Sequence, residues 1–120
     1  MGYLQLYIYR IRKGHREKFL DIMRKAREIY RKHGAYGEEL FALHNKTSKY
    51  GVTSLWEVLP TTEDEELWIG LDRYDSLEHC AEVMKKVDAD PEIEALYERT
   101  IQLVGSASRI VRGEFGMVSY

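Results

Sequence analysis

Aliphatic and amphipathic residues alternate along the first strand-like segment of the chain, residues 3–11. The even positions 4, 6 and 8 are aliphatic, whereas the odd positions 3, 5, 7 and 9 carry tyrosine or glutamine. Because successive side chains of a strand point to opposite faces, one face suits a dry core and the other suits an interface or a cavity. The expected core face holds Leu4, Leu6 and Ile8, and the expected interface or cavity face holds Tyr3, Gln5, Tyr7 and Tyr9.

Apolar residues recur at three- and four-residue spacing in three later segments, which predicts amphipathic helices. The first follows Gly14 and ends at Gly34; the second begins at 75–78, a capping-box spacing; the third begins at Pro91. Their expected buried stripes are Phe19, Ile22, Met23, Ala26, Ile29 and Tyr30; then Leu77, Cys80, Met84 and Val87; then Ile93, Leu96, Tyr97 and Ile101. A further capping-box spacing at 54–57 predicts a short helical turn.

Three more strands are predicted, over 36–44, 65–74 and 109–118. Strand 65–74 repeats the division of the first strand, with Leu67, Ile69 and Leu71 alternating with Trp68, Gly70 and Asp72. The order βαββαβ, with extra short helices, predicts an α+β ferredoxin-like domain that spans 1–120, with an antiparallel sheet and helices on one face. The aromatic face would then be exposed, so we expect a homodimer that covers it, a dimeric α+β barrel.

Composition limits the partners. Residues 1–33 carry ten Lys and Arg against three Asp and Glu, but the whole chain has a net charge of −2 and no RNA-binding signature, so we do not expect nucleic-acid binding. No apolar run approaches a membrane span, and the N-terminus lacks the features of a signal peptide. With Cys80 as the only cysteine, no internal disulfide can form, so we expect a cytoplasmic protein.

Several short segments resemble the uncharacterised YbaA-like family of dimeric α+β barrel proteins. They are Thr53–Glu57, Glu63–Glu66, Asp72–Tyr74, Ser76, Asp88–Pro91 and Arg109–Phe115. The matches are short and spaced, and they include no catalytic fingerprint. The resemblance implies the ferredoxin-like fold and the dimer, and it assigns no catalytic residue.

The candidate ligand-binding residues are aromatic or imidazole side chains on the predicted strands. They are Tyr7, Tyr9, His44, Trp68 and Tyr74. His44 ends a strand and titrates nearest to neutral pH, so it could act as a general base or simply form a hydrogen bond. The aromatic residues could line a small-molecule cavity or bury the dimer interface.

The other reactive side chains have ordinary structural explanations. His15 and His33 lie at the ends of the first helix, and His79 lies in the first turn of the second. Cys80 is expected to be a buried small hydrophobe. Pairing of the strand arginines Arg73 and Arg112 with Asp72 and Glu114 is expected across strands, with anion binding as the alternative. We expect no metal site and no cofactor.

These patterns favour a homodimer that binds a small, partly apolar molecule in a sheet-to-sheet or sheet-to-helix cavity. The first alternative is an enzyme of the same fold, a cofactor-independent monooxygenase or isomerase that uses His44 and the tyrosines. The second is an RNA-associated protein that uses the basic first helix. The sequence assigns no reaction.

Overall fold

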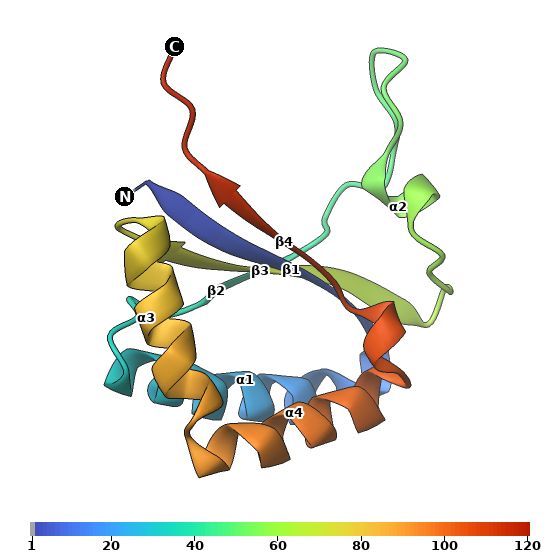
Figure 1. The fold of residues 1–120 in the computed structure, drawn as a ribbon. Coiled ribbons are helices and arrows are strands. Elements are labelled where there is room, and N and C mark those ends of the chain that lie inside the picture. Colours follow the sequence, from blue (N-terminus) through green and yellow to red (C-terminus); the bar gives the residue numbers. More distant parts are fainter. Residues whose placement is uncertain (1) are drawn as a thin grey trace.

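The computed structural model describes residues 2–120 and shows a four-stranded antiparallel sheet with its three longest helices packed on one side (Figure 1). The strands are β1 (Tyr3–Arg12), β2 (Glu39–Ala42), β3 (Glu65–Tyr74) and β4 (Val111–Gly116). The helices are α1 (Arg16–Lys32), α2 (Leu55–Val58), α3 (Leu77–Asp88) and α4 (Pro91–Val104), with 3-10 turns η1 (Lys13–His15) and η2 (Ala107–Arg109). The strand order β2-β3-β1-β4 confirms the predicted ferredoxin-like α+β fold.

Local sequence signals set most of the element ends. The Ser54 and Asp90 side chains accept hydrogen bonds from backbone N–H groups at the starts of α2 and α4. The N-cap of α3 is Ser76, one residue later than the predicted Asp75. The strand predicted over 36–44 is shorter, because Gly37 has a φ of 113°, which a strand does not allow.

The core lies between the sheet and helices α1, α3 and α4, which Figure 1 shows together on one side of the sheet. The Phe19 ring of α1 packs edge-on against Tyr9 and Trp68, with centroids 5.0 and 5.7 Å apart. A second cluster surrounds Tyr74, whose hydroxyl donates to the Gln5 side chain at 2.9 Å. Aromatic residues therefore fill the layer under the helices.

This packing shows that the predicted faces of β1 and β3 were assigned the wrong way round. Helices α1, α3 and α4 cover the face that carries the tyrosines and Trp68, and the aliphatic face points away from these three helices. The physical reason is that buried aromatic side chains find partners for their polar atoms: the Trp68 indole donates to Glu66 at 2.7 Å, for example. Tyrosine and tryptophan side chains can therefore be buried under the helices.

Two helical stripes were also partly misassigned. Leu77 and Tyr97 are each 54% exposed instead of buried. Helix α3 buries Cys80, Val83 and Val87, and α4 buries Leu96, Thr100 and Val104. The α1 stripe is as predicted, with Phe19, Ile22, Met23 and Ile29 buried.

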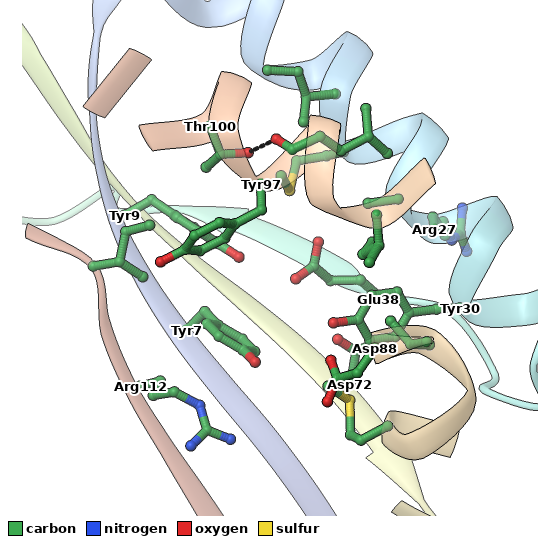
Figure 2. A pocket seen from close by; sticks show the side chains of 18 of the residues that line it. Tyr7, Tyr9, Arg27, Tyr30, Glu38, Asp72, Asp88, Tyr97, Thr100 and Arg112 are labelled. Atoms are coloured by element: carbon green, nitrogen blue, oxygen red, sulfur yellow. Dashed lines mark hydrogen bonds between the residues drawn. The ribbon is translucent and has the colours of Figure 1, made fainter. Parts of the chain in front are cut away.

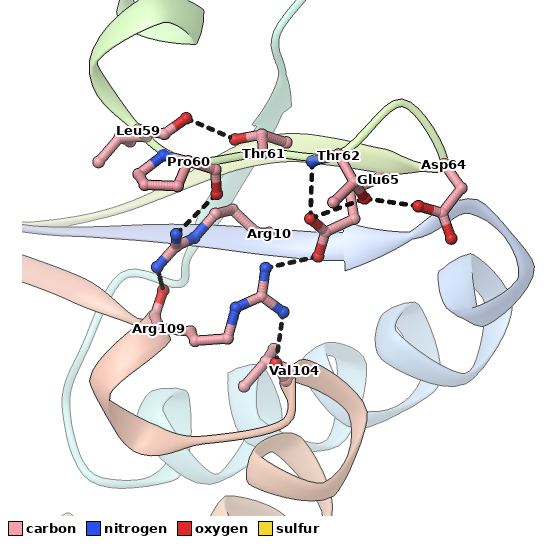
Figure 3. Close-up of polar contacts among 9 residues, drawn as sticks. All are labelled: Arg10, Leu59, Pro60, Thr61, Thr62, Asp64, Glu65, Val104 and Arg109. Carbon is pink, nitrogen blue, oxygen red and sulfur yellow. Dashed lines mark hydrogen bonds and ion pairs between the residues drawn. The ribbon is translucent and has the colours of Figure 1, made fainter.

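A buried polar network joins β1, the start of β3 and the connection from α4 to β4 (Figure 3). The Arg10 guanidinium donates to the carbonyl oxygens of Pro60 and Arg109, at 2.8 and 2.7 Å. Arg109 donates in turn to Glu65 at 2.6 Å and to the Val104 carbonyl at 2.7 Å. Burial opposes ionisation of Glu65, but hydrogen bonds from Thr62 and Arg109 outweigh it and lower its pKa. The network holds η2 in place at one end of the cavity described below.

Candidate functional site

A cavity of about 480 Å³ lies between the sheet and helices α1, α3 and α4. Its floor is formed by β1, β3 and β4, and its apolar walls come from the three helices and η2 (Figure 2). The apolar wall residues include Met23, Ala26, Met84, Val87, Ile93 and Leu96. Tyr97 lines the cavity while half of its side chain is exposed, so it marks an opening to solvent.

Glu38 reaches into this cavity from the segment that leads into β2. Its carboxyl group lies directly over Gly70 of β3: a Cβ atom at position 70 would come within 2.9 Å of the Glu38 Cδ. A Cβ atom at this position of the strand would therefore require the carboxyl end of the Glu38 side chain to move aside. Desolvation, with a further contribution from the charge of Asp72, raises the pKa of Glu38 to about 8.

Asp72 lies beside Glu38, on the same face of β3 as Gly70. The residue is 3% exposed, and its Oδ1 atom has no hydrogen-bond partner among residues 2–120. Burial raises the pKa of Asp72 to about 6, and the positive charge of Arg27 on α1 opposes this shift only in part. A buried carboxyl without a close partner is costly, so its retention on a cavity wall points to a ligand.

Three tyrosines surround the carboxyl pair. Tyr7 and Tyr9 of β1 stack with centroids 6.2 Å apart, and Tyr30 approaches from α1. Burial raises the pKa of all three phenols, so they stay neutral donors at physiological pH. Figure 2 shows Tyr7 between the carboxyl pair and Arg112.

Arg112 of β4 marks the opposite side of the floor. Its guanidinium lies 5.6 Å from the centroid of the Tyr7 ring and is paired with Glu114. The Glu114 carboxylate also accepts a hydrogen bond from Tyr3 at 2.7 Å. The two ends of the cavity therefore differ: Arg112 is paired with its neighbour Glu114, whereas the Asp72 Oδ1 has no partner among residues 2–120.

The structure separates the five predicted ligand-binding residues. Tyr7 and Tyr9 line the cavity. Trp68 and Tyr74 lie in the two core clusters, 3% and 0% exposed, and His44 is exposed after β2. None of these last three is among the described residues that line the cavity.

The remaining reactive residues have structural roles. Cys80 is buried, as predicted, and desolvation raises its pKa to about 11. The His79 ring accepts from the Asp75 N–H and contacts the Gly34 carbonyl, both backbone groups. His33 contacts Asp90 at 2.8 Å. Within residues 2–120, no group of three His, Cys, Asp or Glu side chains is arranged to hold a metal ion, and no helix in that range is long and apolar enough to cross a membrane.

The sequence did not single out the carboxyl pair. Asp72 was expected to pair across strands, but Arg73 pairs with Glu39, and Arg112 pairs with Glu114 on its own strand. Glu38 was missed altogether. Two features of the sequence could have indicated Glu38. It is two residues before Leu40 and so would share its face of an extended strand, and Gly70 is an isolated glycine inside a predicted strand.

The fold and the cavity define an α+β protein of ferredoxin-like architecture with a cavity between its sheet and helices. The chain belongs to the family described as "Protein of unknown function (DUF1428)", whose model matches residues 2–103. No curated protein matches the sequence. The narrower YbaA-like grouping stays a prediction, because the family match does not carry that name.

Solved structures show the same fold at low sequence identity. A dimeric ferredoxin-like protein from an uncultured marine organism has a TM-score of 0.65 at 15% identity, with 99% of this chain and 90% of that chain covered. An uncharacterised NIPSNAP domain protein from Burkholderia xenovorans has a TM-score of 0.59 at 15% identity, with 98% and 96% covered. A protein from Arabidopsis thaliana has a TM-score of 0.58 at 13% identity, with 98% and 97% covered.

Proposed function

We propose that this protein is a homodimeric α+β barrel that binds a small, partly apolar molecule in the cavity between its sheet and helices. The observation that carries the proposal is the cavity itself, about 480 Å³ of space that the core leaves unfilled. Close packing is the rule in protein interiors, and ligand sites typically occupy roughly 300–1,000 Å³. Apolar walls with a few converging polar groups are the usual composition of such a site.

The dimer is proposed from the face of the sheet that the helices leave uncovered. Its side chains are Leu4, Leu6, Ile8, Phe41, Ile69, Leu71, Val111 and Phe115. At its edges Phe41 is 47% and Phe115 is 52% exposed, which is unusual for large apolar residues on a monomer. A second copy of the chain would cover this face, and one solved structure of the same fold is described as dimeric.

The cavity is tested by filling it. Ala26→Phe places a ring in the cavity from α1, whereas Ala81→Phe makes the same change at an exposed position of α3. We expect a thermal-shift screen of aromatic and aliphatic ligands to give hits with the wild type and the Ala81→Phe variant, and none with the Ala26→Phe variant. Hits that persist in a folded Ala26→Phe variant would place binding elsewhere and refute the proposal.

The dimer is tested on the aliphatic face, not on the aromatic one. Leu6→Glu puts a charge opposite Leu71 in the middle of that face, and Ala81→Glu is the control on α3. We expect light scattering to give a dimer for the wild type and the control, and a monomer or an aggregate for the Leu6→Glu variant. A wild type that is monomeric at micromolar concentration would contradict the dimer.

The alternative of a cofactor-independent monooxygenase or isomerase has less support. His44, its proposed base, is exposed and does not line the cavity. An enzyme built on this cavity would have to use Asp72 or Glu38 as its base instead. His44→Ala is then expected to leave ligand binding unchanged.

A further inference from the structure

The carboxyl pair in the cavity indicates which kind of molecule the cavity binds. Asp72 is nine-tenths buried or more and has an unpartnered Oδ1, and it is among the residues that line the cavity. A buried carboxylate without a counter-ion is strongly destabilised, and its natural partner is a cation or a strong hydrogen-bond donor. Among residues 2–120 no side chain supplies such a partner for the Asp72 Oδ1.

A second carboxyl group stands beside it. The Glu38 carboxyl group lies over Gly70, and the charge of Asp72 contributes to the raised pKa of Glu38. Asp72 carries the negative charge of this pair at pH 7, and the charge of Arg27 offsets the effect of its burial only in part. An anionic ligand would make this worse, whereas a cation would relieve it.

The other residues that line the cavity also favour a cation over an anion. Two further carboxylates, Asp88 and Glu94, line the cavity, and of its two arginines Arg112 is already paired with Glu114. Tyrosine rings border the carboxyl pair, as Figure 2 shows for Tyr7. Aromatic faces attract ammonium groups through the ring quadrupole, and the helices supply an apolar wall for the remainder of a ligand.

We propose that the ligand is an organic amine whose ammonium group binds between Asp72 and Glu38 and whose apolar body lies against α1 and α4. This proposal rests on the proposed binding function and specifies its ligand class. It assigns Asp72 as the direct acceptor of the ammonium N–H groups and Glu38 as the second acceptor. Gly70 leaves room for the Glu38 carboxyl group in this position.

Binding should also displace a proton. Glu38, with its raised pKa, is mostly protonated at pH 7, and an ammonium group beside it would favour the ionised form. The titratable and charged groups that line the same cavity are Tyr7 and Tyr9 from β1, Arg27 and Tyr30 from α1, Asp88 from α3, Glu94 and Tyr97 from α4, and Arg112 from β4. The released proton is assigned to Glu38, because its burial raises the pKa of this carboxyl group to about 8.

The test uses three probes that share a phenyl ring on a two-carbon chain and differ in the end group: 2-phenylethylamine, 2-phenylethanol and 3-phenylpropionate. Calorimetric titration at pH 7, with a chelator present to remove divalent metals, should show the amine binding roughly ten- to a hundredfold more tightly than the alcohol. The carboxylate should bind more weakly than the alcohol. The heat of amine binding should vary with the ionisation enthalpy of the buffer, since a proton is released.

Variants identify the acceptor. Asp72→Asn keeps the shape of the side chain and should reduce binding of the amine to the level of the alcohol, while the affinity for the alcohol stays the same. Glu38→Gln should weaken amine binding and abolish the buffer dependence. Glu39→Gln, which changes an exposed carboxylate outside the cavity, should alter neither.

The outcomes separate the two proposals. If the alcohol binds as tightly as the amine, or if the Asp72→Asn variant keeps the preference for the amine, the ligand class is wrong while the binding cavity stands. If none of the three probes binds at millimolar concentration, both the ligand class and the proposed binding function are refuted. Amine binding that is unchanged in the cavity-filled Ala26→Phe variant would also refute both.

Discussion

Removing the charge of Asp72 should stabilise the ligand-free protein at alkaline pH. The carboxyl group is 3% exposed and its Oδ1 has no partner, so ionising it in the folded state is unfavourable. The variant Asp72→Asn keeps the size and planar shape of the side chain and never ionises. The gain in stability should therefore come from the charge alone.

The sign and the size of the effect follow from the shift of the pKa. Burial raises the pKa of Asp72 from 3.8 to about 6 in the folded protein. Below pH 3.8 the group is neutral in both states and costs nothing. As the pH rises from about 4 to 6 the unfolded chain ionises first, so the folded state loses stability, and above pH 6 the loss is complete. Two pKa units correspond to about 3 kcal/mol, or roughly 10 °C in Tm for a chain of this length.

The assay is denaturation followed by circular dichroism at pH 4 and pH 8, at one fixed protein concentration. The Asp72→Asn variant should match the wild type at pH 4 and exceed it at pH 8. Glu39→Gln is the control: it breaks a half-exposed ion pair with Arg73 and should change the free energy of unfolding by less than about 1 kcal/mol. Equal differences at both pH values, or a variant less stable at pH 8, would show that Asp72 is not an unsatisfied charge.

Three further changes test the packing around the site. Gly70→Ala should displace Glu38 and lower both the stability, by about 1–3 kcal/mol, and the affinity for the amine probe; wild-type affinity would show that Glu38 does not need this space. Arg10→Met should cost about 2–3 kcal/mol in urea denaturation, because two buried carbonyl oxygens lose a charged donor; a neutral result would mean that water replaces it. Asp90→Ala removes the N-cap of α4 and the contact with His33, and should lower the free energy of unfolding by about 1–2 kcal/mol; an unchanged Tm would contradict this capping role.

The site shows where the reasoning from sequence reached its limit. Tyr7 and Tyr9 were proposed as cavity residues, and they line the cavity. Glu38 and Asp72 were not, because their relation is set by the register of β3 and by the close approach of the segment before β2. The residues next to Glu38 and Asp72 in the sequence do not indicate that the two carboxyl groups lie close together. The glycine at position 70 is a partial sign, since an isolated glycine inside a strand often marks a close approach.

The ion pairs of the strand arginines could not be predicted from the sequence either. Arg73 and Asp72 are adjacent in sequence, but they lie on opposite faces of β3, so they cannot pair. Arg73 pairs with Glu39 on one face, and Asp72 is left unpaired on the other. Whether a charged strand residue pairs or stays free depends on which residues lie opposite to it on the neighbouring strands.

The sequence by itself determined the elements and their order. Period-two and period-3.6 patterns act locally, as do caps such as Ser54 and Asp90, so the helices and the fold class could be predicted. Only the tertiary structure decided which face of the sheet the helices cover. Both faces of β1 are apolar enough to be buried, and the choice between them depends on distant partners, such as Phe19 for Tyr9 and Gln5 for Tyr74. The same distant packing left a cavity and one buried carboxyl group, Asp72, with an unpartnered oxygen, which no local pattern encodes.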